Sequence, residues 1–348
     1  MLDKIIVTPS PHISKSMSTR SVMLDVVIGL VPAMLAAAYY FRSRALVLIG
    51  VCVITAVGSE WLCNLIRKRS RPGESLGDFS AVVTGIILAL SLPPAIPIWT
   101  AIVGSAFSIV IGKMVFGGLG ANVFNPAMVG RTFLTASFGL LMTTWSVPAT
   151  IDPNIPDISA QGTVDVRTQA TPLNWSKQAI KADGPDQREL RQEFVHNVDD
   201  NLTPSFVGAT GGCLGETSAL ALIIGGIYLL IRKTISFHIP AATLIGAFLF
   251  AFITRLADPT GSISPLSHLC SGALLLGAVF IATDPVTAPL TRRGMWIFGL
   301  GVGVITLLIR VVGEYPEGFM YAILLMNAVT PLIDRLCKRV PAGGKPNV

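Results

Sequence analysis

The chain alternates long apolar stretches with short polar connections. Spanning the hydrocarbon core of a bilayer takes roughly 20 mostly apolar residues in a helix. The pattern predicts about ten such helices, over residues 22–41, 46–66, 79–94, 97–115, 126–145, 215–231, 235–256, 266–283, 295–313 and 318–336. Because backbone groups in lipid must pair within their own segment, we expect an all-α integral membrane protein.

Composition agrees with lipid as the main solvent of the chain. Of its 348 residues, 51% are hydrophobic and only 13% are charged, whereas charged residues make up about 25% of soluble domains. The first twenty residues are polar and contain no continuous apolar run. No cleavable signal peptide is therefore indicated, and the first helix is expected to direct membrane insertion.

The distribution of basic residues predicts the orientation, because cytoplasmic loops carry an excess of Lys and Arg. With the N-terminus in the cytoplasm, most of the 26 Lys and Arg residues lie on that side, including Arg67, Lys68, Lys113, Arg131 and Arg232. Few lie on the short outer connections. We therefore expect both termini to be cytoplasmic. This topology also explains the net charge of +6, so no nucleic-acid partner is expected.

A long polar segment divides the predicted helices into two sets of five. Residues 146–214 are rich in Pro, Asp and Asn. They far exceed the roughly 12–15 residues of a structureless connection, so we expect a small outer subdomain. The chain is then organised as a cytoplasmic segment (1–21), a first membrane repeat (22–145), the outer segment (146–214), a second membrane repeat (215–336) and a cytoplasmic tail (337–348). An odd number of helices per repeat gives the second repeat inverted topology.

Motifs rich in Pro and Gly recur in corresponding helices of the two halves. Thr84-Gly85 and Ser91-Leu92-Pro93-Pro94 in the third helix correspond to Ser271-Gly272 and Thr283-Asp284-Pro285 in the eighth. Interrupted helices in matching positions indicate a pathway at the interface between repeats. Ordinary kinked packing accounts for them equally well.

Several motifs, jointly specific although individually weak, resemble one family. They are Gly77–Gly85, Leu88–Pro94, Gly112–Gly120, Asn122–Pro126, Gly215–Ser218, Ala282–Thr287, Glu314–Gly318 and Leu324–Asn327. Together they resemble, over nearly the whole chain, the D subunits of the Rnf-type ion-translocating ferredoxin:NAD oxidoreductases. A close relative is the B subunit of the sodium-translocating NADH:quinone reductases, which normally has a longer N-terminal region.

The resemblance implies a fold related to urea transporters, in a bacterial or archaeal inner membrane. It also implies a covalent FMN, joined through its phosphate to Thr171 in the outer segment. Asp165, Thr168 and Ala170 match the family's attachment pattern, whereas Gln169 stands where Gly is usual. A second, non-covalent flavin such as riboflavin is compatible with the family. The expected partners are the A, B, C, E and G subunits of the Rnf complex, which passes electrons between ferredoxin and NAD and moves Na+ or H+.

Polar residues in the apolar stretches mark a candidate ion pathway. Asp25 and Glu60 lie in the first two predicted helices, and Thr283 and Asp284 lie at the inner end of the eighth. A charge at a helix centre costs roughly 2.5–3.5 kcal/mol on insertion scales, so such residues usually face protein or a wet cavity. Near helix ends, solvation at the membrane interface is the simpler explanation. The five cysteines form no C-x-x-C pair, so no metal site is indicated.

Alternative functions stay open. A flavin-free solute channel on the same scaffold leaves the outer segment unexplained. The B subunit of the quinone reductase belongs to the same chemical class and binds quinone, and a structural scaffold fits everything except the Thr171 motif. The chain has no dinucleotide fingerprint and no catalytic residue of its own. In the preferred function, other subunits must therefore bind NAD and iron–sulfur clusters.

Overall fold

The computed structural model describes residues 18–68, 73, 75–145, 171–181, 188–200, 202–208, 210–259, 261–313 and 315–338, and all its regular elements there are helical. α1 (Thr19–Ile66) covers the first two predicted spans and is broken at Arg42, whose φ is 51° and ψ is −137°. The neighbouring Arg44 donates hydrogen bonds to the carbonyl oxygens of Pro94 and Ile96. The break therefore separates two helices, as the sequence predicted.

The rest of the first half consists of shorter helices. They are α2 (Ser80–Leu90), α3 (Ile98–Ile109) with a π-helical turn at Val110–Met114, α4 (Pro126–Ser137) and α5 (Gly139–Met142). At 1.5 Å per residue, α2 is about 17 Å long, little more than half of the roughly 30 Å hydrocarbon core. The prediction of a helix over 79–94 was therefore too long, because the buried residues after Leu90 leave the helix before Pro93 and Pro94.

The second half contains four continuous helices and one interrupted segment. The helices are α9 (Ala219–Ile231), α10 (His238–Ala257), α13 (Arg292–Val312) and α14 (Phe319–Leu336). The continuous helix predicted over 266–283 is wrong. Its place is taken by α11 (Pro265–Cys270), α12 (Leu274–Leu276) and a π-helical turn at Gly277–Ile281. Ser271 is extended and Gly272 has a φ of +70°, so the backbone turns between α11 and α12.

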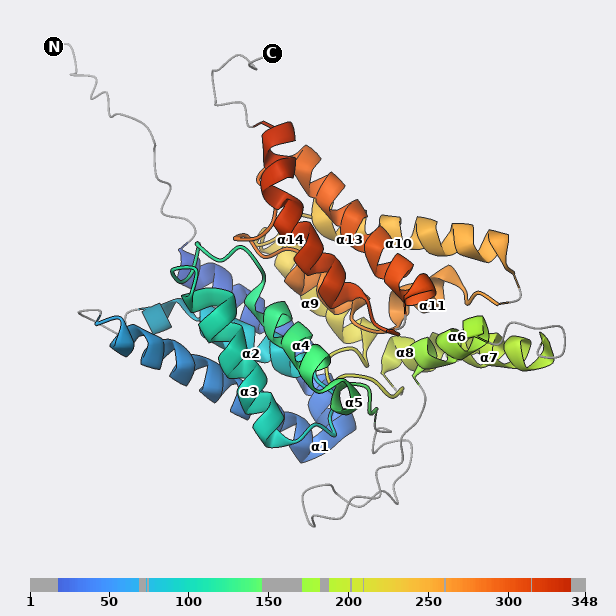
Figure 1. Ribbon diagram of the computed structural model, residues 1–348, viewed down its shortest axis with the longest axis horizontal. Helices are drawn as coiled ribbons and strands as arrows, with labels where there is room; N and C mark the ends of the chain where they lie inside the picture. The colour runs from blue at the N-terminus through green and yellow to red at the C-terminus, as the bar shows by residue number, and fades with distance from the viewer. Residues whose placement is uncertain are drawn as a thin grey trace.

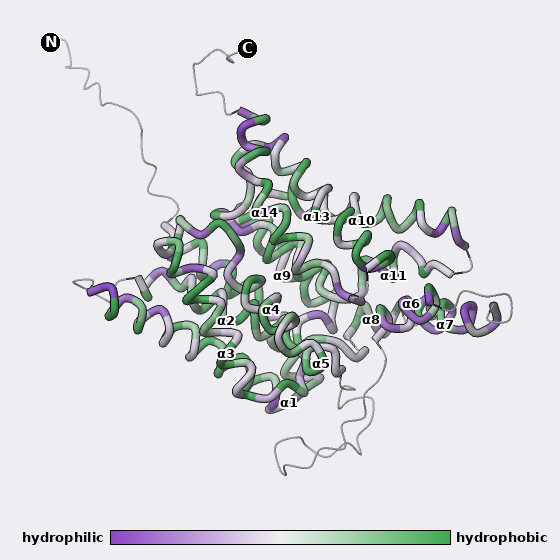
Figure 2. Tube along the Cα trace, in the orientation of Figure 1, coloured by the Kyte–Doolittle hydropathy of each residue, from purple (hydrophilic) through white to green (hydrophobic). Residues whose placement is uncertain are grey.

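The outer segment adds α6 (Pro172–Lys181), α7 (Arg188–Asp200) and α8 (Leu202–Val207). α6 and α7 pack together and project from one end of the molecule (Figure 1), and they are more hydrophilic than the neighbouring α10 (Figure 2). Asp199 of α7 accepts hydrogen bonds from the amide of Ser264, the hydroxyl of Ser267 and the guanidinium of Arg255. Burial alone raises the pKa of Asp199, but these hydrogen bonds outweigh it, so the pKa lies below its usual value.

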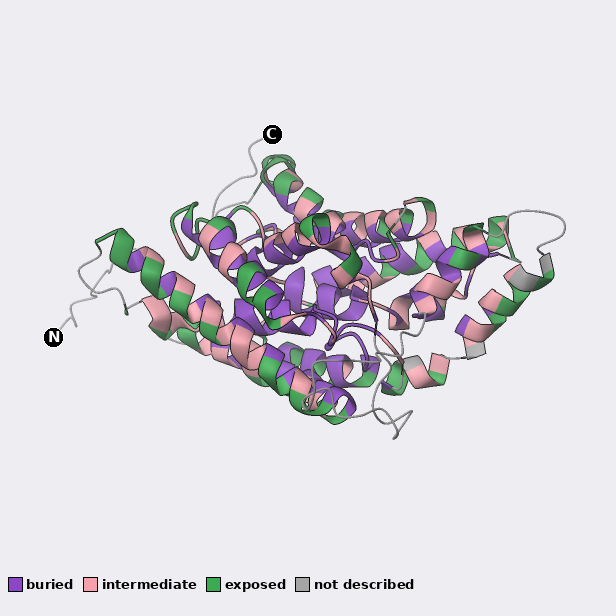
Figure 3. Cartoon of the chain, turned by 60° about the horizontal axis from the view of Figure 1, so that its bottom comes forward, coloured by how far each residue is buried: buried purple, intermediate pink, exposed green. Residues whose placement is uncertain are grey.

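The exposed surface of the long helices is apolar. Leu35 and Ile54 of α1, Ile253 of α10 and Val312 of α13 are all more than 60% exposed, while buried residues gather between the helices (Figure 3). In the described residues, α1, α10, α13 and α14 are long and apolar enough to cross a bilayer, and three further apolar helices are shorter. The prediction of an all-α membrane protein is confirmed.

The two halves meet in close contact between α1 and α9. A Cβ atom added to Gly225 of α9 would overlap the carbonyl oxygen of Gly29 in α1 and approach the ring of Phe280. Small residues let membrane helices approach closely and gain van der Waals contact. The position of α1 against α9 therefore depends on this glycine pair.

Candidate functional site: two cavities between the halves

Segments from both halves of the chain line one cavity, which we call the Asp284 cavity. It holds an empty volume of about 730 Å³, its open mouth included. α2 contributes Thr84 and Ile87 to the wall, and the segment after α12 contributes Phe280, Thr283 and Asp284. Irregular backbone at membrane depth is tolerated where it lines a cavity, which explains why the chain can leave the regular helix at the π-helical turn and at residues 283–286.

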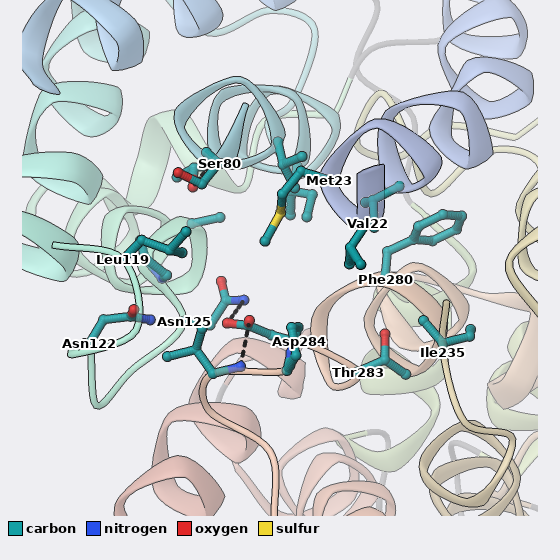
Figure 4. A pocket seen from close by; sticks show the side chains of 18 of the residues that line it. Val22, Met23, Ser80, Leu119, Asn122, Asn125, Ile235, Phe280, Thr283 and Asp284 are labelled. Carbon is teal, nitrogen blue, oxygen red and sulfur yellow. Dashed lines mark hydrogen bonds between the residues drawn. The ribbon is translucent and has the colours of Figure 1, made fainter. Parts of the chain in front are cut away.

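Asp284 faces the cavity with an amide partner from the other half. Asn125 Nδ2 lies 3.5 Å from Asp284 Oδ2 across the repeat interface, at the outer limit of a hydrogen bond, and the two side chains point toward each other (Figure 4). The backbone amide of Val286 and the hydroxyl of Thr287 also donate to Asp284. In the described part of the chain, no basic side chain forms an ion pair with this carboxylate.

A buried ion pair lies beside the same cavity. Lys113, in the π-helical turn after α3, donates to Glu60 Oε2 at 2.7 Å and to Ser80 Oγ at 2.6 Å. Lys113 and Glu60 are each only 1% exposed, and Lys113 lines the cavity. The prediction that Lys113 belongs to a cytoplasmic loop was therefore wrong. It lies inside the protein because Glu60, which is equally deep, compensates its charge.

The four candidate ion-pathway residues fall into two groups. Thr283 and Asp284 line the cavity together. Asp25 lies 3.3 Å from Arg232 Nε and accepts a hydrogen bond from Thr234. Asp25 and Glu60 are thus each compensated by a basic side chain, and neither lines the Asp284 cavity.

Thr171 lies at a second cavity, which we call the Thr171 cavity. Its empty volume is about 420 Å³, and its wall includes Thr171, Trp145, Glu216 and Ser271. The Thr171 hydroxyl accepts a hydrogen bond from the amide of Asn174 and so caps α6. The other residues of the attachment pattern, Asp165, Thr168 and Ala170, lie outside the described residues.

Two buried ion pairs support this cavity. Arg131 of α4 lies 2.9 Å from Glu216, and Arg310 of α13 lies 3.2 Å from Glu317. Glu216 and Glu317 line the cavity, whereas their arginines stand behind them. Arg131 is only 2% exposed, so its assignment to a cytoplasmic loop was also wrong. The sequence analysis missed these pairs, although a cation inside an apolar stretch was a signal that an acidic partner had to exist.

The residues around Thr171 fit an attached flavin phosphate. The hydroxyl lies at the N-terminus of α6, where the helix dipole and free amides favour negative charge. The cavity beside it opens next to this hydroxyl and has polar groups in its wall. Trp145 Nε1 and Ser271 Oγ are buried without a hydrogen-bond partner in the described residues. Within the same residues, no cluster of His, Cys, Asp and Glu could hold a metal ion.

Comparison with known proteins agrees with the family resemblance of the sequence motifs. The model of the NQR2, RnfD, RnfE family matches residues 6–343. The D subunit of the Na(+)-translocating ferredoxin:NAD(+) oxidoreductase complex of Acetobacterium woodii is 41% identical, over 95% of this chain and 93% of that protein. The D subunits of the ion-translocating oxidoreductase complexes of Salmonella newport and Cronobacter sakazakii are each 38% identical, over 94% of this chain and 95% and 96% of theirs.

Proposed function

Because the chain belongs to the NQR2, RnfD, RnfE family, we propose that it is the D subunit of an ion-translocating ferredoxin:NAD oxidoreductase complex. The Acetobacterium woodii relative carries this name, and the Salmonella relative is named the D subunit of an ion-translocating oxidoreductase complex; both are about 40% identical over nearly their whole length. The protein is part of an electron-transfer enzyme and is not catalytic alone. Its partners are the A, B, C, E and G subunits of the complex, which bind the nucleotide and the clusters.

The observation that carries the redox role is the position of Thr171. Its hydroxyl is at once the cap of α6 and part of a cavity wall, so an FMN phosphate joined to it extends directly into a protein-lined space. Bound FMN supplies the electron-carrying chemistry, whereas the protein positions the cofactor and tunes it. The helix N-terminus stabilises the phosphate charge, and the buried wall limits the access of water.

The membrane arrangement that we propose has two inverted repeats of five helices, related to that of urea transporters. The lining of the Asp284 cavity supports it, because α2 and the π-helical turn at Gly277–Ile281 come from opposite halves and line the same cavity. We place the termini in the cytoplasm of a bacterium or archaeon and Thr171 on the outer side. Lys113 and Arg131 no longer count toward this orientation, but the basic clusters at 67–71, 232–233 and 292–293 still do.

The Asp284 cavity is the proposed route of the translocated ion, Na+ or H+. Asp284 supplies a carboxylate and Thr283 a neighbouring hydroxyl, and hard cations prefer oxygen ligands. The same cavity has the mixed apolar and polar wall that is typical of ligand pockets, and we place the second, non-covalent flavin, such as riboflavin, there. Asp25 and Glu60 contribute to stability in this proposal, since each is already paired with a cation.

Attachment of flavin to Thr171 decides between this function and a solute channel. The full chain is co-expressed with a flavin transferase, denatured in SDS and examined for flavin fluorescence in the gel. We expect a fluorescent wild-type band and a dark Thr171→Ala band, with Thr210→Ala from the same cavity wall as a fluorescent control. Flavin released into the supernatant reports a non-covalent second cofactor. A dark wild-type band beside a fluorescent reference protein favours the flavin-free channel.

A further inference from the structure

The Thr171 cavity contains buried hydrogen-bond donors that have no partner among the described residues. Trp145 is 7% exposed and Ser271 is 4% exposed, and both line the cavity. Neither Trp145 Nε1 nor Ser271 Oγ has a hydrogen-bond partner among the described residues. A buried polar group without a partner costs about 1–3 kcal/mol, so native proteins rarely keep two beside one cavity unless something else binds there.

The cavity also contains a carboxylate with spare acceptor capacity. Glu317 is saturated, because it accepts from the amides of Ala273 and Gly318 and pairs with Arg310. Glu216 lines the same wall and pairs with Arg131. An ionised carboxylate offers about four lone-pair sites, so Glu216 can accept a further hydrogen bond. The wall thus offers two neutral donors and one charged acceptor.

This set of groups complements one edge of a flavin ring. The pyrimidine edge of the isoalloxazine presents two carbonyl oxygens with an imide N–H between them. We propose that Trp145 and Ser271 donate to these carbonyl oxygens and that Glu216 accepts from the imide N–H. The inference rests on the proposed function, because the ring reaches this wall through its attachment at Thr171.

Ordered water is the competing explanation for the unused donors, since water commonly satisfies buried polar groups. The two explanations differ in when the donors matter. If water binds them, removing a donor affects the protein whether or not flavin is attached. If the ring binds them, removing a donor affects only the flavin-loaded protein.

The test compares loaded and flavin-free full-length protein in detergent, produced with and without the flavin transferase. The variants are Trp145→Phe, which keeps an aromatic ring, and Ser271→Ala. Thr100→Val is the matched control, because the Thr100 hydroxyl is also buried without a partner in the described residues and lies away from both cavities. In-gel fluorescence verifies attachment in every sample.

We expect both cavity variants to stay flavinylated and, without flavin, to melt at or above the wild-type temperature. When loaded, they should lose part of the stabilisation that flavin gives the wild type, shift the visible flavin absorption band and raise fluorescence quenching by iodide. Thr100→Val should change none of these. Glu216→Gln, which removes a negative charge beside the ring, should raise the flavin's midpoint potential.

Two outcomes overturn the inference and are distinguishable. If the wild type and both variants are fluorescent but share one absorption spectrum, one quenching constant and one gain in melting temperature, the ring lies elsewhere, and the proposed function stands. If the wild-type band is dark while the reference protein is fluorescent, the proposed function fails and the inference fails with it.

Discussion

Replacing Lys113 tests how the membrane domain holds a charge in its interior. Its Nζ atom lies 2.7 Å from Glu60 Oε2, and both side chains are only 2% exposed. Methionine in Lys113→Met is unbranched and similar in shape to lysine but has no charge, so the Glu60 carboxylate would face a methyl group. Breaking one side of a buried ion pair costs about 3–5 kcal/mol. The ratio of folded to unfolded protein should therefore fall by roughly two to four powers of ten.

Two further variants set the scale of this effect. Replacing both residues, as Glu60→Leu with Lys113→Met, leaves no uncompensated charge, so its stability should be near that of the wild type or above it. Arg232→Met removes the partner of Asp25, but the Arg232 side chain is 53% exposed. The Asp25 side chain is only 9% exposed, but it keeps hydrogen bonds from the Tyr228 and Thr234 hydroxyls, so this variant should melt a little below the wild type and well above Lys113→Met.

The assay uses cysteines that the protein already has. Cys52 and Cys213 are free and buried, so a dye that fluoresces on reacting with thiols reports unfolding in detergent as the temperature rises. The double variant and the wild type should have similar melting temperatures. The melting temperature of Arg232→Met should be slightly lower, and that of Lys113→Met should be far lower. If Lys113→Met and Arg232→Met have the same melting temperature, breaking the buried pair does not cost the roughly 3–5 kcal/mol expected for it. If the stable double variant assembles but does not pump ions, the pair is retained for function.

Three more predictions follow from the fold and the site. Gly225→Ala should lower the melting temperature because its methyl group meets Gly29, whereas Gly50→Ala, with open space around it, should be neutral or stabilising. The lowered pKa of Asp199 favours its ionised form. The stability that the Asp199 carboxylate gives to the packing of α7 is therefore complete above pH about 3.9 and is lost as the pH falls through the lowered pKa. Asp199→Asn should expose α7 to limited proteolysis at neutral pH, and unchanged digestion would contradict this. Asp284→Asn should slow redox-driven ion uptake into vesicles while flavin attachment persists, and undiminished uptake would remove Asp284 from the pathway.

Hydropathy predicted the long helices well because lipid imposes a minimum length on them. α10, α13 and α14 lie within a few residues of the ranges expected from their apolar runs. The same reasoning overestimated α2 and missed the interruption between α11 and α12. Residues such as Leu92 are fully buried but not helical, because protein surrounds them and the backbone can leave the helix there. An apolar run therefore reports burial, and only the flanking Pro and Gly residues indicate where the helix ends.

The buried charges show why the candidate site was only partly predictable. Counting basic residues treats each as solvated, whereas Lys113 binds a carboxylate 53 positions away in the sequence, a contact that no local pattern encodes. Among the described residues, the four buried acids, Asp25, Glu60, Glu216 and Glu317, each have a basic partner. Among the described residues, Asp284 faces a cavity without one. A carboxylate in a low-dielectric setting needs a counter-charge or a proton. Since the protein supplies a cation to each of the four buried acids, we propose that a mobile cation or proton compensates Asp284.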